Sequence, residues 1–166
     1  EVLAGGGPAD VVELTVELAR TMLTMAGQPD ADVEAALKDG RAMDVWRAMI
    51  REQGGDPDAA LPTSALTHTV TAEADGFISE MDALSVGVAS WRLGAGRAVK
   101  DDPVQAGAGI EIHAKPGQRV RKGEALFTLH TDDEWRIPRA LEALDGGVRI
   151  SDTAPAARSI ILDRVG

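Results

Sequence analysis

Histidine and cysteine, two residue types that often bind metals or take part in catalysis, are few or absent in this sequence of 166 residues. There is no cysteine, which excludes disulfides, thiolate metal ligands and a cysteine nucleophile. The three histidines are His68, His113 and His130, and none forms an HxxxH or HExxH pair. Two of them fall at the ends of expected strands, where an imidazole often bonds the backbone. We therefore expect no metal-ligating residue here.

Carboxylates cluster at residues 56–58, 101–102 and 132–134. Neighbouring acids on a strand or turn point in different directions, so such clusters rarely provide a catalytic pair. Asp133 and Glu134 precede an expected helix, where negative charge is favourable. No GxSxG nucleophile motif occurs. We expect these acids to be solvated or to cap helices.

Glycine-rich stretches at 5–7, 94–97 and 106–109 are candidates for binding phosphate. The first is followed by no Lys or Ser/Thr at phosphate-loop spacing, and the others do not complete GxGxxG. They are interpreted as tight turns and a helix start. The residue types thus predict no catalytic and no cofactor-binding residue. If activity resided in this chain, the first side chains to examine would be Arg97, Lys100, Asp101 and His113.

Charge and composition exclude several classes of protein. With 17 basic and 27 acidic residues the net charge is −10, which disfavours binding to nucleic acid or to an anionic membrane. The five aromatic residues are scattered and offer no stacking platform for single strands. No apolar run reaches the roughly 18 residues of a membrane helix, and the first residues do not resemble a signal peptide. A cytoplasmic location is expected.

Apolar spacing predicts helices over the first third of the chain. The first runs from Pro8 to Gly27, the second is capped by Asp30 and ends at Gly40, and the third ends at Gly54-Gly55. The apolar face expected for the first helix comprises Val11, Leu14, Leu18, Met22 and Met25. The stretch DPDAALPTSA that follows the third helix is rich in turn formers and is interpreted as a linker.

After residue 67 the pattern is mainly that of strands. They are expected at 67–72, 76–81, 110–113, 119–120, 125–130, 148–150 and 160–162. One helix is expected between Asp82 as N-cap and Gly94, and another from near Pro138 to Gly146-Gly147. The sequence therefore predicts an α+β fold, with helices in residues 1–60 and a second domain over 67–166.

Residues 109–130, GIEIHAKPGQRVRKGEALFTLH, contain the pattern G-x-x-V-x-x-G-x-x-L-F-x-L. This pattern resembles half of a biotinyl or lipoyl carrier domain, a flattened β-sandwich. Such domains display a modified lysine in an MKM or DKA context. None of Lys38, Lys100, Lys115 and Lys122 has that context. A carrier-like binding module without a modified lysine is one interpretation of the chain.

A second resemblance covers essentially all 166 residues. It is carried by AMDVW at 42–46, by ADGFISEMDALSVGVASWRLGAGRAVKDDP at 74–103 and by VQAGAGIEIHAKPGQRVRKGEALFTLHTDDE at 104–134. The middle block combines DG-F-x-x-x-M-D, a helix and LGAGR in one order. These strings resemble the C-terminal part of the pyrimidine nucleoside phosphorylase family, to which thymidine phosphorylases belong. The sequence lacks an initiator methionine, and we expect it to be a segment of a longer chain.

The resemblance implies a function and an architecture. Members of this family are cytoplasmic homodimers that cleave thymidine or deoxyuridine with phosphate, giving the free base and 2-deoxyribose 1-phosphate. Residues 1–60 would be the last helices of an α/β domain plus a linker. Residues 67–166 would form an α/β hammerhead with a barrel-sandwich hybrid, which explains the carrier-like pattern. Phosphate is the co-substrate, and the remaining N-terminal part of the phosphorylase is the implied partner.

The resemblance carries over no site residue. The family's phosphate-binding stretch, which resembles KHSxGGVGD, does not occur in this sequence, nor does its Arg…Ser…Lys set for the pyrimidine. The chemistry depends on positioning phosphate and stabilising an oxocarbenium-like transition state. We therefore expect a structural role for this segment, which on its own is inactive. The apolar face of the first helix is then expected to be partly unmatched within this chain.

Overall fold

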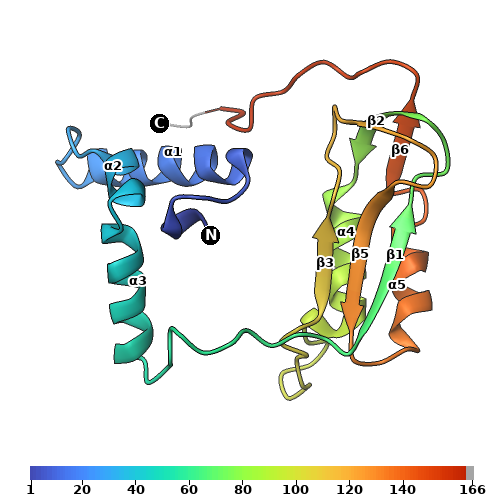
Figure 1. Cartoon of the computed structure of the whole chain (residues 1–166), viewed down its shortest axis with the longest axis horizontal. Helices are drawn as coiled ribbons and strands as arrows, with labels where there is room; N and C mark the ends of the chain where they lie inside the picture. The colour runs from blue at the N-terminus through green and yellow to red at the C-terminus, as the bar shows by residue number, and fades with distance from the viewer. Residues whose placement is uncertain (164–166) are drawn as a thin grey trace. The chain divides into compact units, whose positions relative to one another are not determined.

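A computed structural model describes residues 1–163, with mixed helix and sheet, which confirms the predicted α+β class. The chain divides into two compact units (Figure 1). One is Glu1–Ala59 together with residues 158–163, and the other is Ala60–Ala157. Each unit has its own hydrophobic core.

The first unit is helical, as its apolar spacing predicts. Its elements are a 3-10 turn η1 (Val2–Ala4) and the helices α1 (Ala9–Met25), α2 (Val33–Lys38) and α3 (Arg41–Glu52). Its buried core consists of Val16, Val33 and Leu37. The second helix is capped by Asp32, whose side chain accepts from the Ala35 N–H, so the expected cap at Asp30 is wrong. Both aspartates suit a cap, and the one adjacent to Val33 has the required spacing.

The helix α1 buries a different face from the expected one. Its packed residues are Val12, Val16, Ala19 and Leu23, which contact the core formed with α2. The expected face is exposed, with Leu18 at 54% and Met22 at 63%. The reason is that α1 has two apolar stripes, and the six-residue α2 is too short to cover both. The prediction that the stripe is partly unmatched within this chain is confirmed, and the face that packs against α2 is one that the apolar spacing did not indicate.

The second unit contains two three-stranded antiparallel sheets. Sheet A has the order β1-β5-β3, formed by Leu66–Thr71, Ala125–Thr131 and Gly109–Ile112. Sheet B has the order β4-β2-β6, formed by Arg119–Val120, Gly76–Met81 and Val148–Ser151. These six strands confirm the strand predictions. The seventh, at 160–162, is wrong, because these residues are irregular and too few to form a strand without a partner.

Helices complete the second unit. They are α4 (Ala83–Ser90), the short π-helical turn η2 (Trp91–Ala95) and α5 (Arg136–Leu144). Both predicted helices are confirmed. Ala89 on α4 and Ala140 on α5 are fully buried in the same core as Ile78 and Phe127. The core therefore lies between the sheets and the two helices.

The start of α4 provides a pH-dependent test of this fold. The Asp82 carboxylate accepts from the Ser85 hydroxyl and from the N–H groups of Ser85 and Leu84, which holds its pKa below the usual 3.8. Because the Asp82 pKa is lower in the folded than in the unfolded chain, ionised Asp82 stabilises the fold above pH 3.8, the ordinary value. This stabilisation is lost as the pH falls through the Asp82 pKa of the folded chain. We expect Asp82→Asn to lower the urea midpoint near neutral pH and to match the unsubstituted chain at strongly acidic pH. Asp152→Asn, at an exposed carboxylate, should change neither midpoint.

Candidate functional site

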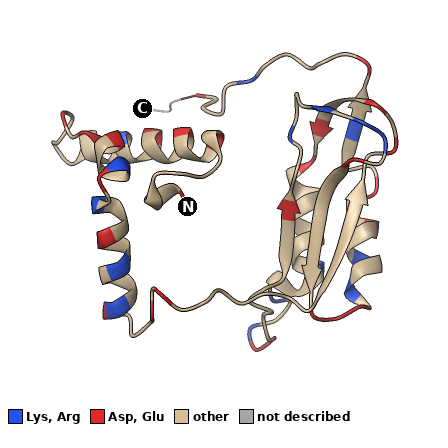
Figure 2. Ribbon diagram, viewed as in Figure 1, with Lys and Arg blue, Asp and Glu red and all other residues tan. Residues whose placement is uncertain are grey.

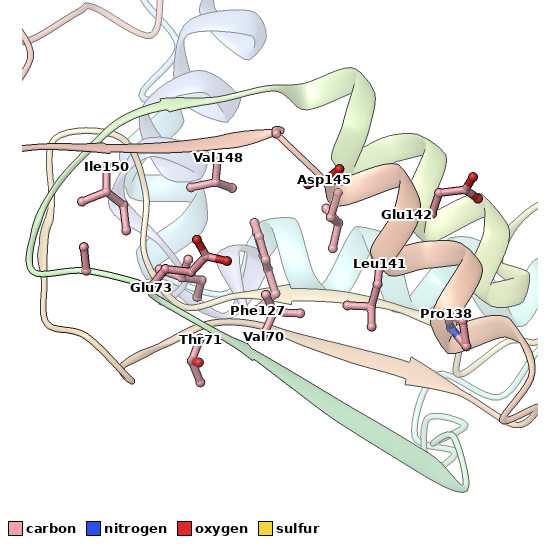
Figure 3. Close-up of a pocket in the computed structure, with 14 residues that line it drawn as sticks. Val70, Thr71, Glu73, Phe127, Pro138, Leu141, Glu142, Asp145, Val148 and Ile150 are labelled. Atoms are coloured by element: carbon pink, nitrogen blue, oxygen red, sulfur yellow. The ribbon is translucent and has the colours of Figure 1, made fainter.

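An open groove of about 840 Å³ lies in the second unit, between β1, β5, β6 and α5 (Figure 3). Its floor is apolar. The half-buried residues Val70, Leu141, Val148 and Ile150 line it, with Phe127 beneath them. A concave surface of this size with an apolar floor is typical of a binding site.

The polar lining of the groove is acidic. Glu73, Glu142 and Asp145 line it, and no Lys, Arg or His does. Glu142 pairs with Arg92, whose Nη1 lies 2.9 Å from its Oε2. Within residues 1–163, neither Glu73 nor Asp145 forms an ion pair. The arrangement suits binding an apolar group beside a cation and offers no evident nucleophile.

A network of hydrogen bonds holds the end of β5 against the turn after α4. Thr131 is fully buried, and its hydroxyl donates to the Leu93 carbonyl at 2.7 Å. The Gln105 side chain accepts from the Asp132 N–H and donates to Asp133 Oδ2 at 2.7 Å. Since Thr131 ends β5 and Asp133 precedes α5, this network fixes where α5 begins and so positions one wall of the groove.

A smaller hollow of about 260 Å³ lies beside η2 and the start of α5. Trp91 and Trp135 line it and are 41% and 56% exposed. The Arg136 guanidinium lies 4.6 Å from the centre of the Trp135 ring, a cation–π contact. Arg136 also pairs with Asp133 at 2.9 Å. The hollow is thus built largely from groups that already contact one another.

The three histidines do not form a site with one another. His113 Nε2 lies 2.7 Å from the Thr128 hydroxyl, and His130 Nε2 lies 3.8 Å from Glu111 Oε2. His68 is exposed on β1. No group of three or more His, Cys, Asp or Glu residues within the described range 1–163 could hold a metal ion. That the chain supplies no metal ligand stays a prediction.

The acidic cluster at 101–102 and its neighbours form a surface turn. Asp102 Oδ2 accepts from the N–H groups of Ala98 and Val99, each at 3.0 Å. Arg97 donates to the Lys100 carbonyl at 3.4 Å. The turn does not include His113. The four side chains named for first examination are therefore not assembled into one site.

The remaining predicted residues also have structural partners. Asp132 accepts from the Ala65 N–H, and Asp58 pairs with Arg47 at 3.0 Å. Lys115 and Lys122 lie in two separate turns, one on each side of β4, closed by bonds from the Gln118 N–H to the Lys115 carbonyl and from the Glu124 N–H to the Arg121 carbonyl. The three groove carboxylates have no sequence signal, because Glu73 lies far along the chain from Glu142 and Asp145. None of the helices seen in residues 1–163 could cross a bilayer.

The family model and the relatives that match this chain all carry the name of one kind of protein, the pyrimidine nucleoside or thymidine phosphorylases. Residues 77–151 match the model of the pyrimidine nucleoside phosphorylase C-terminal domain. The chain is 49% identical over 165 residues to a thymidine phosphorylase of Mycobacterium tuberculosis, covering 99% of this chain and 39% of that protein. It is 35% identical over 165 residues to a pyrimidine-nucleoside phosphorylase of Staphylococcus epidermidis, covering 93% of this chain and 38% of that protein.

A pyrimidine-nucleoside phosphorylase of Bacillus subtilis is 33% identical over 171 residues, covering 96% of this chain and 39% of that protein. The chain thus spans about two fifths of the length of these relatives. The matched relatives are phosphorylases, which favours this family over the alternative of a carrier-like module. The chain matches the C-terminal portion of members of the pyrimidine nucleoside phosphorylase family.

Proposed function

We propose that this chain is the C-terminal portion of a thymidine phosphorylase. The whole protein would cleave thymidine or deoxyuridine reversibly with phosphate, giving the free base and 2-deoxyribose 1-phosphate. The observation that carries the proposal is 49% identity to a thymidine phosphorylase over 99% of this chain. The whole protein is further proposed to be a cytoplasmic homodimer with no cofactor and no affinity for nucleic acid or membrane.

The proposed role of this portion is structural. The phosphate-binding and pyrimidine-binding residues of the family are not in this sequence, so the reacting groups belong to the N-terminal part of the phosphorylase. Residues 1–60 are proposed to be the last helices of the α/β domain. Residues 67–166 are proposed to form the hammerhead with its barrel-sandwich hybrid. The two sheets formed from residues 66–151 support that assignment.

The direct test is phosphorolysis of thymidine by this 166-residue chain, with phosphate present and free thymine as the readout. We expect no thymine from this chain. We expect activity when the same residues are part of a longer chain that carries the family's phosphate-binding stretch. Thymine production by the 166-residue chain would contradict the structural role. An inactive but folded longer chain would contradict the proposed activity.

The exposed stripe on α1 supplies a second test. If the N-terminal part of the phosphorylase covers this stripe, Leu18→Glu should barely change the stability of the 166-residue chain, because Leu18 is 54% exposed. In the longer chain the same substitution should lower the melting temperature clearly. Val16→Ala, at a position only 6% exposed, should destabilise the first unit in both contexts by about 1–3 kcal/mol.

Thermal unfolding of both chains by circular dichroism measures these differences. If Leu18→Glu lowers the melting temperature of the longer chain no more than that of the 166-residue chain, the stripe stays uncovered in the longer chain. Self-association of the short chain, measured by sedimentation, should also weaken in this variant, because the stripe is a large exposed apolar surface.

A further inference from the structure

The groove of the second unit lies between two unpaired strand edges. Among the described residues 1–163, β1 of sheet A is hydrogen-bonded to β5 on one side only, and β6 of sheet B is bonded to β2 on one side only. Val70 on β1 and both Val148 and Ile150 on β6 line the groove (Figure 3). The hollow is therefore a gap at the edge of the two sheets.

The edge formed by β1 is open to strand addition. Its sequence, LTHTVT, carries no Lys, Arg, Asp or Glu and no proline, and Figure 2 shows β1 and the adjacent β5 free of charged residues. Natural proteins usually protect an edge strand with charge, proline or a covering element. Five of the six residues of β1 are exposed. Such an edge offers main-chain hydrogen bonds to an extended peptide.

The groove beside this edge selects the chemistry of its occupant. Its floor exposes aliphatic side chains, which favours aliphatic residues at alternate positions of an added strand. Glu73 and Asp145 line it without an ion pair in residues 1–163, and no basic side chain lines it. The negative charge of these two carboxylates favours a partner with a cationic side chain and repels an acidic segment.

We propose that the groove binds an extended segment of another polypeptide. The segment adds to the free edge of β1, places alternate aliphatic side chains on the groove floor and places lysine or arginine beside Glu73 and Asp145. This interaction is separate from the phosphorylase chemistry, since no residue of the groove is placed in the reaction. The partner is recognised by its pattern, alternating aliphatic residues in a short extended stretch that also carries lysine or arginine.

The test uses the 166-residue chain and the capped peptide Lys-Val-Thr-Ile-Thr-Val-Lys. We expect saturable binding with a Kd below about 1 mM, the weak end of specific association. Amide NMR shifts should concentrate on β1 and methyl shifts on Leu141, Val148 and Ile150. The same peptide with glutamate at both ends should not bind. A peptide with proline in place of both its isoleucine and the threonine that follows should not bind either, because one of two successive N–H groups must face β1 and proline cannot donate.

Matched variants test the charges. The double variant Glu73→Gln with Asp145→Asn should weaken binding about three- to tenfold, as two exposed ion pairs allow. The double variant Glu134→Gln with Asp152→Asn removes the same charge at exposed positions outside the groove and should bind like the unsubstituted chain.

Several results would overturn the proposal. They are no saturable binding of the lysine peptide, equal binding of the glutamate or proline peptides, and equal weakening in both double variants. Octylammonium is included as a further probe. If it shifted the groove methyl signals while the lysine peptide did not bind, the groove would be a site for small amphiphilic amines, and the proposal would be wrong.

Discussion

Phe127→Ala is expected to lower the free energy of unfolding of the second unit by about 3–5 kcal/mol. The ring is 1% exposed and is the largest of the fully buried side chains. Its residue lies on β5, the central strand of sheet A, and pairs with Val70 on one side and Ile112 on the other. Both neighbours are held by the sheet register, so the space left by the ring cannot close fully.

The measurement is urea unfolding followed by tryptophan fluorescence in a Trp46→Phe background. That background leaves Trp91 and Trp135, both in the second unit, as reporters. Leu84→Ala is the control, because Leu84 is 74% exposed and its loss should cost less than about 0.5 kcal/mol. A cost for Phe127→Ala as small as that of the control would show that β5 is not packed as described.

Gly76→Ala is expected to cost about 2–5 kcal/mol in the same unit. A Cβ on Gly76 would lie 2.6 Å from the Ile150 Cγ2 and 2.7 Å from the Ser151 carbonyl oxygen. The Ser151 carbonyl belongs to the backbone of β6, which pairs with β2 directly beside Gly76. The clash with an added Cβ can therefore be removed only if the two strands move apart. The φ of +156° at Gly76 adds strain for any residue with a side chain.

Substitutions at two other glycines separate the cost of the steric contact from the cost of the positive φ. A Cβ on Gly117 meets nothing within 4 Å, but its φ is +91°, so Gly117→Ala reports the backbone cost, about 1–2 kcal/mol. A Cβ on Gly109 also meets nothing, and no positive φ is found there, so Gly109→Ala should be nearly neutral. We expect the unfolding cost to rise from Gly109 through Gly117 to Gly76. A Gly76 variant no less stable than the Gly117 variant would show that the strand contact is looser than described.

The strands of the second unit could be predicted because glycine turns separate them. The expected ranges 76–81 and 119–120 agree with β2 and β4 as found. Each strand is a short run of β-branched and apolar residues between turn formers, a signal that is local in the sequence. The Asp82 cap was predictable for the same reason, since its partners lie two and three residues away.

Features that depend on distant residues could not be predicted. The face that α1 buries is decided by α2, because both faces of α1 are apolar and the sequence of α1 alone does not rank them. Gln105 and Thr131 are 26 residues apart, and no spacing rule joins them. The groove likewise combines residues from four elements between Val70 and Ile150. Local patterns identify the elements, while the contacts between elements define the candidate site.

The central position of β5 in sheet A has a consequence for synthesis on the ribosome. In the part of the chain that the structure describes, β1 and β3 pair only with β5, and the register joins Leu66 to Thr131. At roughly 5–20 residues per second, β1 emerges about 3–12 s before its partner is complete. During that interval an uncharged, threonine-rich strand has nothing to pair with, whereas the contacts between α1 and α2 can already form. The nascent chain is therefore most open to misassembly between the appearance of β1 and that of β5.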